Sequence, residues 1–384
     1  MNDILVARTG KVGGATIVDE KLVGLNANQN VVNIRINDHE YSPIITTIFL
    51  NSRFGKEQFI RASTGNVQPW LNLTLLRKIK IPKFGKPLEK IISSLFDKAV
   101  GFNEKSKTNY KLAEDLLDIE LGFENFNPSN EKISIKSLKE SFLKTGRLDS
   151  EYYQLKYDDY LKKVFAYSEG YELVGECCNL KDKNYIPKDD TEYKYIELAN
   201  VRSNAEIADC EIMIGKELPT RARRKVNTGD VIVSSIEGSL ESCALITEEY
   251  NNSLCSTGFY VINSDKLNSE SLLTVFKSSL MFNLMKKGCS GTILTNILKD
   301  EFLKLPIPIL KSNVQDEIAS YIKQSMEYSK KAKELLNIST KAVEIAIEKD
   351  EEMAHNLLDR QTDRQTDRQT DRQTDRYTDP SYIL

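Results

Sequence analysis

The sequence feature that most constrains the fold is an apolar helical pattern that occurs twice, 226 residues apart. The first copy runs over Leu88–Leu116 and the second over Val314–Ala342. In both copies apolar or small residues recur at alternating spacings of four and three, which keeps one stripe of a helix facing a partner helix. Each stripe is about 43 Å long at 1.5 Å per residue, too long for a helix inside one small core. The pattern predicts two long spacer helices; two ordinary amphipathic helices are the simpler alternative.

The predicted contact positions of these helices are called the seam. The seam consists of Leu88, Ile92, Leu95, Phe102 and Leu116 in the first helix, and Val314, Ile318, Tyr321, Tyr328 and Leu335 in the second.

The duplication extends into the segment before each helix. Asp3–Val6 resembles Asp230–Val233 at an offset of 227, and Ile79–Pro82 resembles Leu303–Pro306 at an offset of 224. We attribute this drift to small loop changes between the copies. Hydrophobic patterning in each copy predicts short strands followed by one helix. The expected strands are 4–6, 15–18, 30–36, 230–233 and 258–263, and the expected helices are 43–60 and 269–286.

The two copies are unequal in length. Residues 145–228 precede Asp230, and their counterpart would lie ahead of Met1. We therefore expect the first module to be about half a domain. Its opening strand should expose backbone edges or apolar faces that a complete domain would cover.

The end of the chain differs in kind. From Asp359 to Asp379 the sequence repeats Asp-Arg-Gln-Thr, with Tyr377 as the one exception. The repeat alternates charge and has no apolar side chain to bury, so it should be disordered. The peptide can be encoded by repeating the tetranucleotide ACAG, which gives the same cyclic peptide in all three frames. A change in repeat number would therefore alter the residues that come after the tract.

Composition excludes several classes of function. The formal net charge of −3 gives no global signal for nucleic acid, so a DNA-binding face would depend on local clusters. No run is long enough to span a membrane and no signal peptide is evident, which favours a cytoplasmic protein. The six cysteines show no paired metal-binding spacing, and only two histidines are present, so we expect buried free thiols and no metal site.

Sequence signatures of catalysis are missing as well. Asn127-Pro128-Ser129-Asn130 fails the last two positions of the Asn-Pro-Pro-aromatic motif of adenine methyltransferases. No Gly-x-x-x-x-Gly-Lys phosphate-binding loop occurs. We therefore expect a chain that is not an enzyme and that holds no cofactor itself.

In order and in duplicate, several short motifs resemble the specificity subunit of type I restriction–modification enzymes. They cover residues 1 to about 350 and are individually weak. The first copy supplies Asp3–Gly10, Ser63–Gln68 with Leu71-Asn72, and Ile79–Pro82. The second copy supplies Arg147-Leu148-Asp149, Tyr152-Tyr153, Pro219–Arg223, Gly229–Val231, Ser256–Phe259, Ser290–Thr292 and Leu305–Pro308.

The resemblance implies an α+β protein in which two target-recognition domains, each a small mixed sheet with helices, are separated by long helices that pair as an antiparallel coiled coil. It implies double-stranded DNA as ligand, two docked methyltransferase subunits, and a restriction subunit that joins through them. S-adenosylmethionine, ATP and magnesium would be bound by those partners. The expected parts are a partial first recognition domain (1–84), a central spacer helix (85–122), a complete second recognition domain (140–311), a distal spacer helix (312–358) and a disordered tail (359–384).

Candidate DNA contacts are cations, amides and hydroxyls on expected turns, where side chains can reach phosphates or base edges. A solvated loop is an equally plain reading for the densest cluster, which spans residues 221–225. The candidates are Arg8, Lys11, Asn66, Gln68, Lys181, Lys183, Arg221, Arg223, Arg224, Lys225 and Thr292.

Two alternatives stay open at this point. One is a shortened assembly or scaffold form that binds methyltransferase without full DNA readout. The other is the specificity component of a type II restriction enzyme. The sequence leaves open the target site and the methylated base.

Overall fold

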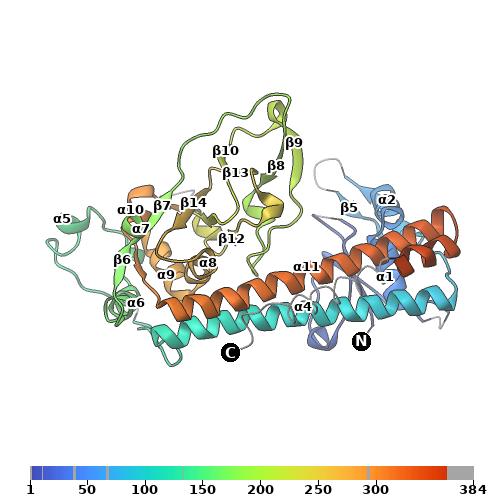
Figure 1. Cartoon of the computed structure of the whole chain (residues 1–384), viewed down its shortest axis with the longest axis horizontal. Helices are drawn as coiled ribbons and strands as arrows, with labels where there is room; N and C mark the ends of the chain where they lie inside the picture. Colours follow the sequence, from blue (N-terminus) through green and yellow to red (C-terminus); the bar gives the residue numbers. More distant parts are fainter. Residues whose placement is uncertain are drawn as a thin grey trace, which may run out of the picture. The chain divides into compact units, whose positions relative to one another are not determined.

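The structure, a computed structural model, describes residues 2–10, 12–37, 40–65, 69–131, 133–291 and 295–360. The chain divides into two compact units: unit 1 is Met1–Lys105 with Glu327–Leu384, and unit 2 is Ser106–Met326. Each unit combines short strands with helices, which confirms the predicted α+β class (Figure 1). None of the described helices has both the length and the apolar content that crossing a membrane requires.

Unit 1 is built on a three-stranded antiparallel sheet in the order β2-β1-β3, with β1 (Ile4–Ala7) between β2 (Ala15–Ile17) and β3 (Val31–Ile34). Alternate residues of a strand point to opposite faces. Ile4 and Val6 accordingly share one apolar core with Phe49 and Phe59 of the following helices. One face of the sheet is thus covered by helices.

The expected helix 43–60 is two helices, and this prediction is corrected. α1 (Pro43–Asn51) ends at Ser52, and α2 (Arg53–Ala62) begins directly after it. The Ser52 hydroxyl donates to Phe49 O at 2.6 Å and accepts from Gly55 N at 3.4 Å. The side chain thereby satisfies a carbonyl of the first helix and an amide of the second, which stabilises the corner between them.

The expected helix 269–286 is divided in the same way. α8 (Ser269–Lys277) and α9 (Ser279–Gly288) meet at Ser278, which lies 226 residues after Ser52. Its hydroxyl donates to Val275 O at 2.6 Å and accepts from Met281 N at 3.3 Å. Both units therefore contain the same serine-capped helix corner.

Unit 2 has a four-stranded sheet in the order β12-β11-β14-β7. The central pair β11 (Val231–Ser234) and β14 (Phe259–Ser264) is antiparallel and lies between β12 (Cys243–Leu245) and β7 (Cys178–Leu180). Val231 and Val233 face α8 and α9 in the main core, while Ile232 faces a second core.

The second core lies beneath a second sheet, in the order β10-β13-β8-β9. Its strands are β8 (Glu192–Ile196), β9 (Glu211–Ile214), β10 (Ala222–Lys225) and β13 (Leu254–Ser256). The remaining elements of unit 2 are α5 (Phe142–Thr145), α6 (Leu155–Phe165), β6 (Tyr171–Leu173), α7 (Val174–Cys177), β15 (Cys289–Ser290), β16 (Asn296–Ile297), α10 (Lys299–Leu303) and β17 (Pro306–Pro308). All six cysteines are free thiols, five of them buried.

Strand register aligns the two units residue by residue. Leu5 pairs with Thr16 and Asn33 in unit 1, whereas its counterpart Ile232 pairs with Ala244 and Val261 in unit 2. The three residues of unit 2 are fully buried, whereas Thr16 and Asn33 are exposed. Among the described residues of unit 1 no second sheet covers this face. The expectation of an exposed apolar face is therefore wrong, because polar residues occupy it.

A buried aspartate precedes the central strand in both units and is held differently in each. In unit 2, Asp230 accepts from Lys181 at 2.8 Å and from Asn263 at 3.0 Å. In unit 1, Asp3 forms an ion pair with Arg35 at 2.6 Å and accepts from Asn33 at 2.9 Å. These hydrogen bonds hold the pKa of Asp3 well below its ordinary value. Arg35 thus supplies the cation that Lys181, next to β7, supplies in unit 2.

A short hairpin follows the helix corner in each unit. β4 (Ser63–Thr64) pairs with β5 (Trp70–Leu71), and β15 pairs with β16 in the same register. Leu71 and Ile297, both fully buried, are therefore equivalent at an offset of 226. The following helices, α3 (Leu73–Leu76) and α10, begin 226 residues apart as well. The expected offset of 224 in this region is corrected: the offset of 226 also aligns Pro82 with Pro308.

Two long helices complete the fold, α4 (Lys86–Leu121) and α11 (Ser312–Glu348). The predicted distal helix 312–358 is interrupted, because α11 ends at Glu348 and the chain is helical again over 351–360. In this second stretch Ala354 and Leu358 are buried in the core of unit 1. The tail was expected to begin at residue 359, but 359 and 360 are helical, and 361–384 lie outside the described residues.

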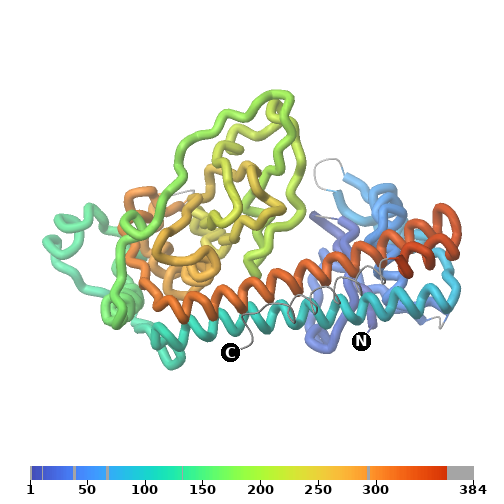
Figure 2. Tube along the Cα trace, viewed as in Figure 1, coloured from blue at the N-terminus to red at the C-terminus, as the bar shows by residue number. Residues whose placement is uncertain are grey.

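In unit 1 the seam residues of α4 and α11 contact each other (Figure 2). Phe102 stacks on Tyr328 with ring centroids 5.9 Å apart, and these two residues are equivalent positions of the repeat. Lys105 and its equivalent Lys331 lie within 5.8 Å of both rings. A residue that contacts its own equivalent lies beside a local twofold axis, so the helices are antiparallel here. Leu88, Ile92, Leu95 and Leu335 pack in the same part of the pair.

In unit 2 the helix pair contains a buried polar layer. Ser106 Oγ donates to Ser325 O and Ser325 Oγ donates to Ser106 O, each at 2.8 Å. The remaining seam residues of this unit pack against its main core, with Val314 and Ile318 buried and Leu116 and Tyr321 partly buried. Hydrogen bonds made reciprocally at one level fix the register of the two helices.

Candidate nucleic-acid interface

The densest basic cluster of the sequence lies along the edge strand β10 of the second sheet in unit 2. β10 pairs with β13 through a register shift between Ala222 and Arg224. Arg221 precedes the strand and is exposed, and its carbonyl accepts from Thr257 N at 2.9 Å. Arg223 is half-buried, and its Nε donates to Thr220 O at 3.1 Å. Two guanidinium groups are thus positioned by backbone contacts at a sheet edge.

The other two cations of this cluster hold the neighbouring segment 182–185. Arg224 donates to Asp182 O and, at 3.1 Å, to Asn184 Oδ1. Lys225 lies over the Tyr185 ring, 5.3 Å from its centroid. The Lys299 ammonium pairs with Asp182 and holds the pKa of that carboxyl below its ordinary value. Arg224 and Lys225 therefore order a loop on which Lys183 is exposed.

Lys181 has a different role from the other candidates. Its ammonium forms an ion pair with Asp230, whose side chain is only 3% exposed. The same carboxylate accepts from Asn227 N at 2.8 Å. Lys181 thus belongs to the scaffold of the first sheet and is not part of the DNA-contacting edge.

The two hairpins share their backbone pairing and differ in side chains. In unit 1, Arg8 Nε donates to Leu71 O at 3.0 Å, and the guanidinium lies over Trp70 at 5.2 Å. In unit 2, Thr295 donates its hydroxyl hydrogen to the Glu237 carboxylate. Sequence reasoning found Arg8 but missed Trp70 and Glu237, although Trp70 is the single tryptophan of the chain. Lys11, Asn66, Gln68 and Thr292 lie outside the described residues.

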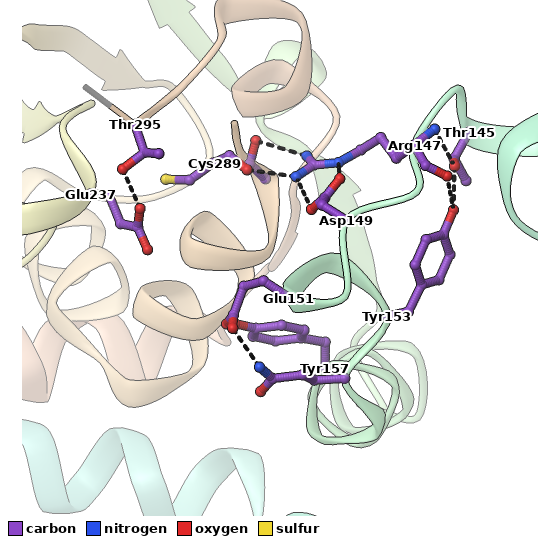
Figure 3. A network of polar contacts seen from close by, with 11 residues as sticks. Thr145, Arg147, Asp149, Glu151, Tyr153, Tyr157, Glu237, Cys289 and Thr295 are labelled. Atoms are coloured by element: carbon purple, nitrogen blue, oxygen red, sulfur yellow. Dashed lines mark hydrogen bonds and ion pairs between the residues drawn. The ribbon is translucent and has the colours of Figure 1, made fainter. Parts of the chain in front are cut away.

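Figure 3 shows the polar network that anchors the start of the second module to its hairpin. Arg147 forms an ion pair with Asp149 at 2.6 Å, donates to Cys289 O at 2.7 Å, and stacks on Tyr152 at 4.4 Å. The neighbouring Tyr153 hydroxyl lies 2.5 Å from Thr145 Oγ1. The Arg147 guanidinium lowers the pKa of Asp149, and burial raises the pKa of Cys289 to about 12. This network joins residues about 140 positions apart in sequence.

These features define a class of module rather than a reaction centre. Unit 2 presents cations on the edge of a rigid two-sheet fold, and the described residues contain no cluster of three or more metal-ligating side chains. Residues 170–337 match the family model described as the type I restriction modification DNA specificity domain. The chain therefore contains a DNA specificity domain of this family, in the region that carries the basic cluster.

Comparison with solved structures gives similar proteins. The HsdS subunit from Thermoanaerobacter tengcongensis is 21% identical with a TM-score of 0.36, and the match covers 46% of each chain. The type I restriction-modification S subunit from M. genitalium is 13% identical with a TM-score of 0.39, over 89% of this chain and 81% of that one. A structure described by complex assembly and conformational transition of the type I R-M system is 14% identical, over 89% and 81% of the two chains, with a TM-score of 0.29. The chain thus spans under half of the first of these structures. No curated protein matches it.

Proposed function

We propose that this chain is the DNA sequence-recognition subunit of a type I restriction–modification system. The observation that supports the proposal is the basic edge of β10, which lies within the matched residues 170–337. Arg221, Arg223 and Lys183 would contact phosphates or guanine edges, because guanidinium and ammonium groups are suited to both. In unit 1, Arg8 beside Trp70 would contribute contacts to the other half of a bipartite site.

Partners would supply the chemistry in this proposal. The paired helices α4 and α11 would bind two methyltransferase subunits, which use S-adenosylmethionine, and a restriction subunit using ATP and magnesium would join through them. The chain itself would act in the cytoplasm as a non-catalytic scaffold. Half-sites one turn of B-DNA apart are about 34 Å from each other, so a reader of two half-sites needs a stiff spacer.

We expect DNA affinity to fall steeply with salt, since neutralised phosphates release counterions. Arg221→Glu should weaken binding and reduce the salt slope by about 0.9 for each phosphate that the variant no longer neutralises. Filter binding of the complex, co-expressed with its methyltransferase subunit, measures both quantities. Lys216→Glu is the matched control, because it changes the same charge at an exposed position beside β9. A slope near zero for the unchanged complex would exclude DNA contact through this chain.

The repeat tract at residues 359–379 would make the C-terminus phase-variable. Loss or gain of one ACAG unit shifts the reading frame, keeps the repeated peptide and replaces the residues from Tyr377 onward. Sequencing this locus in many sibling colonies should reveal several repeat numbers. One invariant number in all colonies would refute this part of the proposal.

The scaffold alternative has one observation in its favour. The sheet of unit 1 has polar residues on the face that a second sheet covers in unit 2, so the two units would not read DNA equally. Methylome sequencing with and without the gene separates the alternatives: a recognition subunit leaves a methylated motif, and a scaffold form does not. Neighbouring genes separate type I from type II, since type I needs distinct methylation and restriction genes.

A further inference from the structure

An exposed apolar segment of unit 2 has no role in the basic edge of β10. Residues 133–148, here called the arm, connect α4 to the second module and include the short helix α5. Ile135 is 91% exposed and Leu143 is 69% exposed. The other large apolar side chains of the arm are also exposed: Ile133, Leu138, Phe142 and Leu148. Single exposed apolar residues are ordinary, but six within sixteen positions are typical of an interaction surface.

The arm is fixed at both ends, although its apolar side chains face outward. Before it, Phe126 packs edge-on against Tyr160 of α6, with ring centroids 4.9 Å apart. Ser129 N donates to Asp159 Oδ2 at 3.0 Å. At its far end, Arg147 is bound to Asp149 and to Cys289 O. Figure 1 shows α5 standing away from the two sheets of unit 2.

Hydrogen bonds also order the middle of the arm. Ser141 Oγ donates to Ser137 O at 2.8 Å. The Glu140 carboxylate accepts from Ser137 N at 3.0 Å and from Ser137 Oγ at 2.7 Å. Lys136 forms an ion pair with Asp158 of α6 at 3.7 Å. An apolar surface whose backbone is already ordered loses little conformational entropy when a partner binds.

Charge on the arm selects among the classes of partner. Lys139 and Lys144 flank the apolar pair Phe142 and Leu143, and both are exposed. Within the described part of the chain neither takes part in a salt bridge, whereas the carboxylate of Glu140 is occupied by Ser137. The surface is thus apolar with a cationic border, which fits an apolar partner surface bordered by carboxylates.

Two other occupants fit less well. DNA offers phosphates for the lysines, but it would leave the exposed isoleucine and leucine side chains without apolar cover. A second copy of the chain would place the same cationic border opposite itself in a twofold contact, and like charges repel there.

We infer that the arm is a docking surface for the methyltransferase subunit, through a segment of that subunit that has apolar residues bordered by Asp or Glu. This inference rests on the proposed function, which supplies the partner. The arm would act in addition to the long helices, at the start of the second module.

The test uses the full chain co-expressed with its methyltransferase subunit. A photo-crosslinking amino acid at position 135 or 143 should capture the methyltransferase subunit, and one at the exposed Ile212 of β9 should not. The double variant Ile135→Glu/Leu143→Glu should bind this subunit at least tenfold more weakly than the unchanged chain. Ile212→Glu is the matched control and should bind normally. Unchanged DNA binding by the double variant shows that unit 2 is still folded.

The lysine border has its own readout. Lys139→Glu/Lys144→Glu should slow association at low salt severalfold, and the difference should vanish at high salt, because screening removes the attraction. Equal binding by the double apolar variant, or crosslinks from positions 135 and 143 to DNA or to another copy of this chain, would overturn the inference while leaving the proposed function intact. If the unchanged chain forms no complex with the methyltransferase subunit, the proposed function fails together with the inference.

Discussion

Phe302→Ala should lower the free energy of unfolding of unit 2 by about 3–5 kcal/mol, the largest stability effect expected in this protein. Phe302 lies in α10 and is fully buried. Its ring stacks on Tyr260, with centroids 4.3 Å apart, and on Phe276, with centroids 5.7 Å apart. Removing the ring would leave a cavity between α8, α10 and the first sheet. The loss combines the transfer free energy of the ring with the cost of that cavity.

The effect should extend to the hairpin β15–β16, because Tyr260 also donates its hydroxyl hydrogen to Ile297 O at 2.8 Å. Hydrogen exchange of the complete chain measures the unfolding of unit 2 without assuming that both units unfold together. Phe165→Ala is the matched control: its ring is 52% exposed, and the loss should stay below about 1 kcal/mol. Equal effects of the two substitutions would contradict the packing described for α10.

Arg147→Ala should cost about 2–3 kcal/mol, because it removes a charged donor from partly buried acceptors. The Arg147 side chain is 16% exposed, and its guanidinium contacts Asp149, Cys289 O and the Tyr152 ring (Figure 3). Arg147→Lys should not restore the loss, since an ammonium lacks the planar fork that reaches a carboxylate and a carbonyl together. Faster hydrogen exchange is expected at 145–153 and 288–290.

The comparison with Arg202→Ala makes this prediction specific. Arg202 also pairs with an aspartate, Asp209 at 3.5 Å, but both side chains are more than half exposed. An exposed pair of this kind contributes about 0.2–1 kcal/mol, so this variant should be nearly neutral. The difference between the two arginines should shrink in acid: Arg147 lowers the pKa of Asp149, and the stability from that carboxylate is lost as pH falls through its folded pKa. A constant difference down to strongly acidic pH would contradict this role of the pair.

Much of the fold could be predicted from the sequence, because the 226-residue repeat relates every element of unit 1 to one of unit 2. The predicted strands and both long helices reflect apolar periodicity, which depends on neighbouring residues alone. The helix corners at Ser52 and Ser278 were missed, since a serine inside an apolar helical pattern does not by itself show whether it caps a new helix. The shift from an offset of 224 to 226 became visible only through hairpin register.

The candidate site was less predictable, because the roles of its cations depend on distant partners. Arg221 and Arg224 look alike in the sequence, yet Arg224 is bound to residues 182 and 184, some forty positions away. Lys181 was chosen for its charge, whereas its ion pair with Asp230 requires two strands to be adjacent in space. The exposure of the arm could not be predicted either, since its apolar residues would suit a buried segment equally well.

The polar face of the unit 1 sheet has a consequence for any attempt to extend that unit. A designer who grafts residues 181–228 of unit 2 onto the unit 1 sheet would enclose the Asn33 amide and the Arg35–Asp3 pair beneath an apolar layer. Dehydrating these groups carries a penalty that a single hydrogen bond between them does not offset. The graft would therefore have to be accompanied by Thr16→Ala and Asn33→Val, which restore the residues found beneath the second sheet of unit 2.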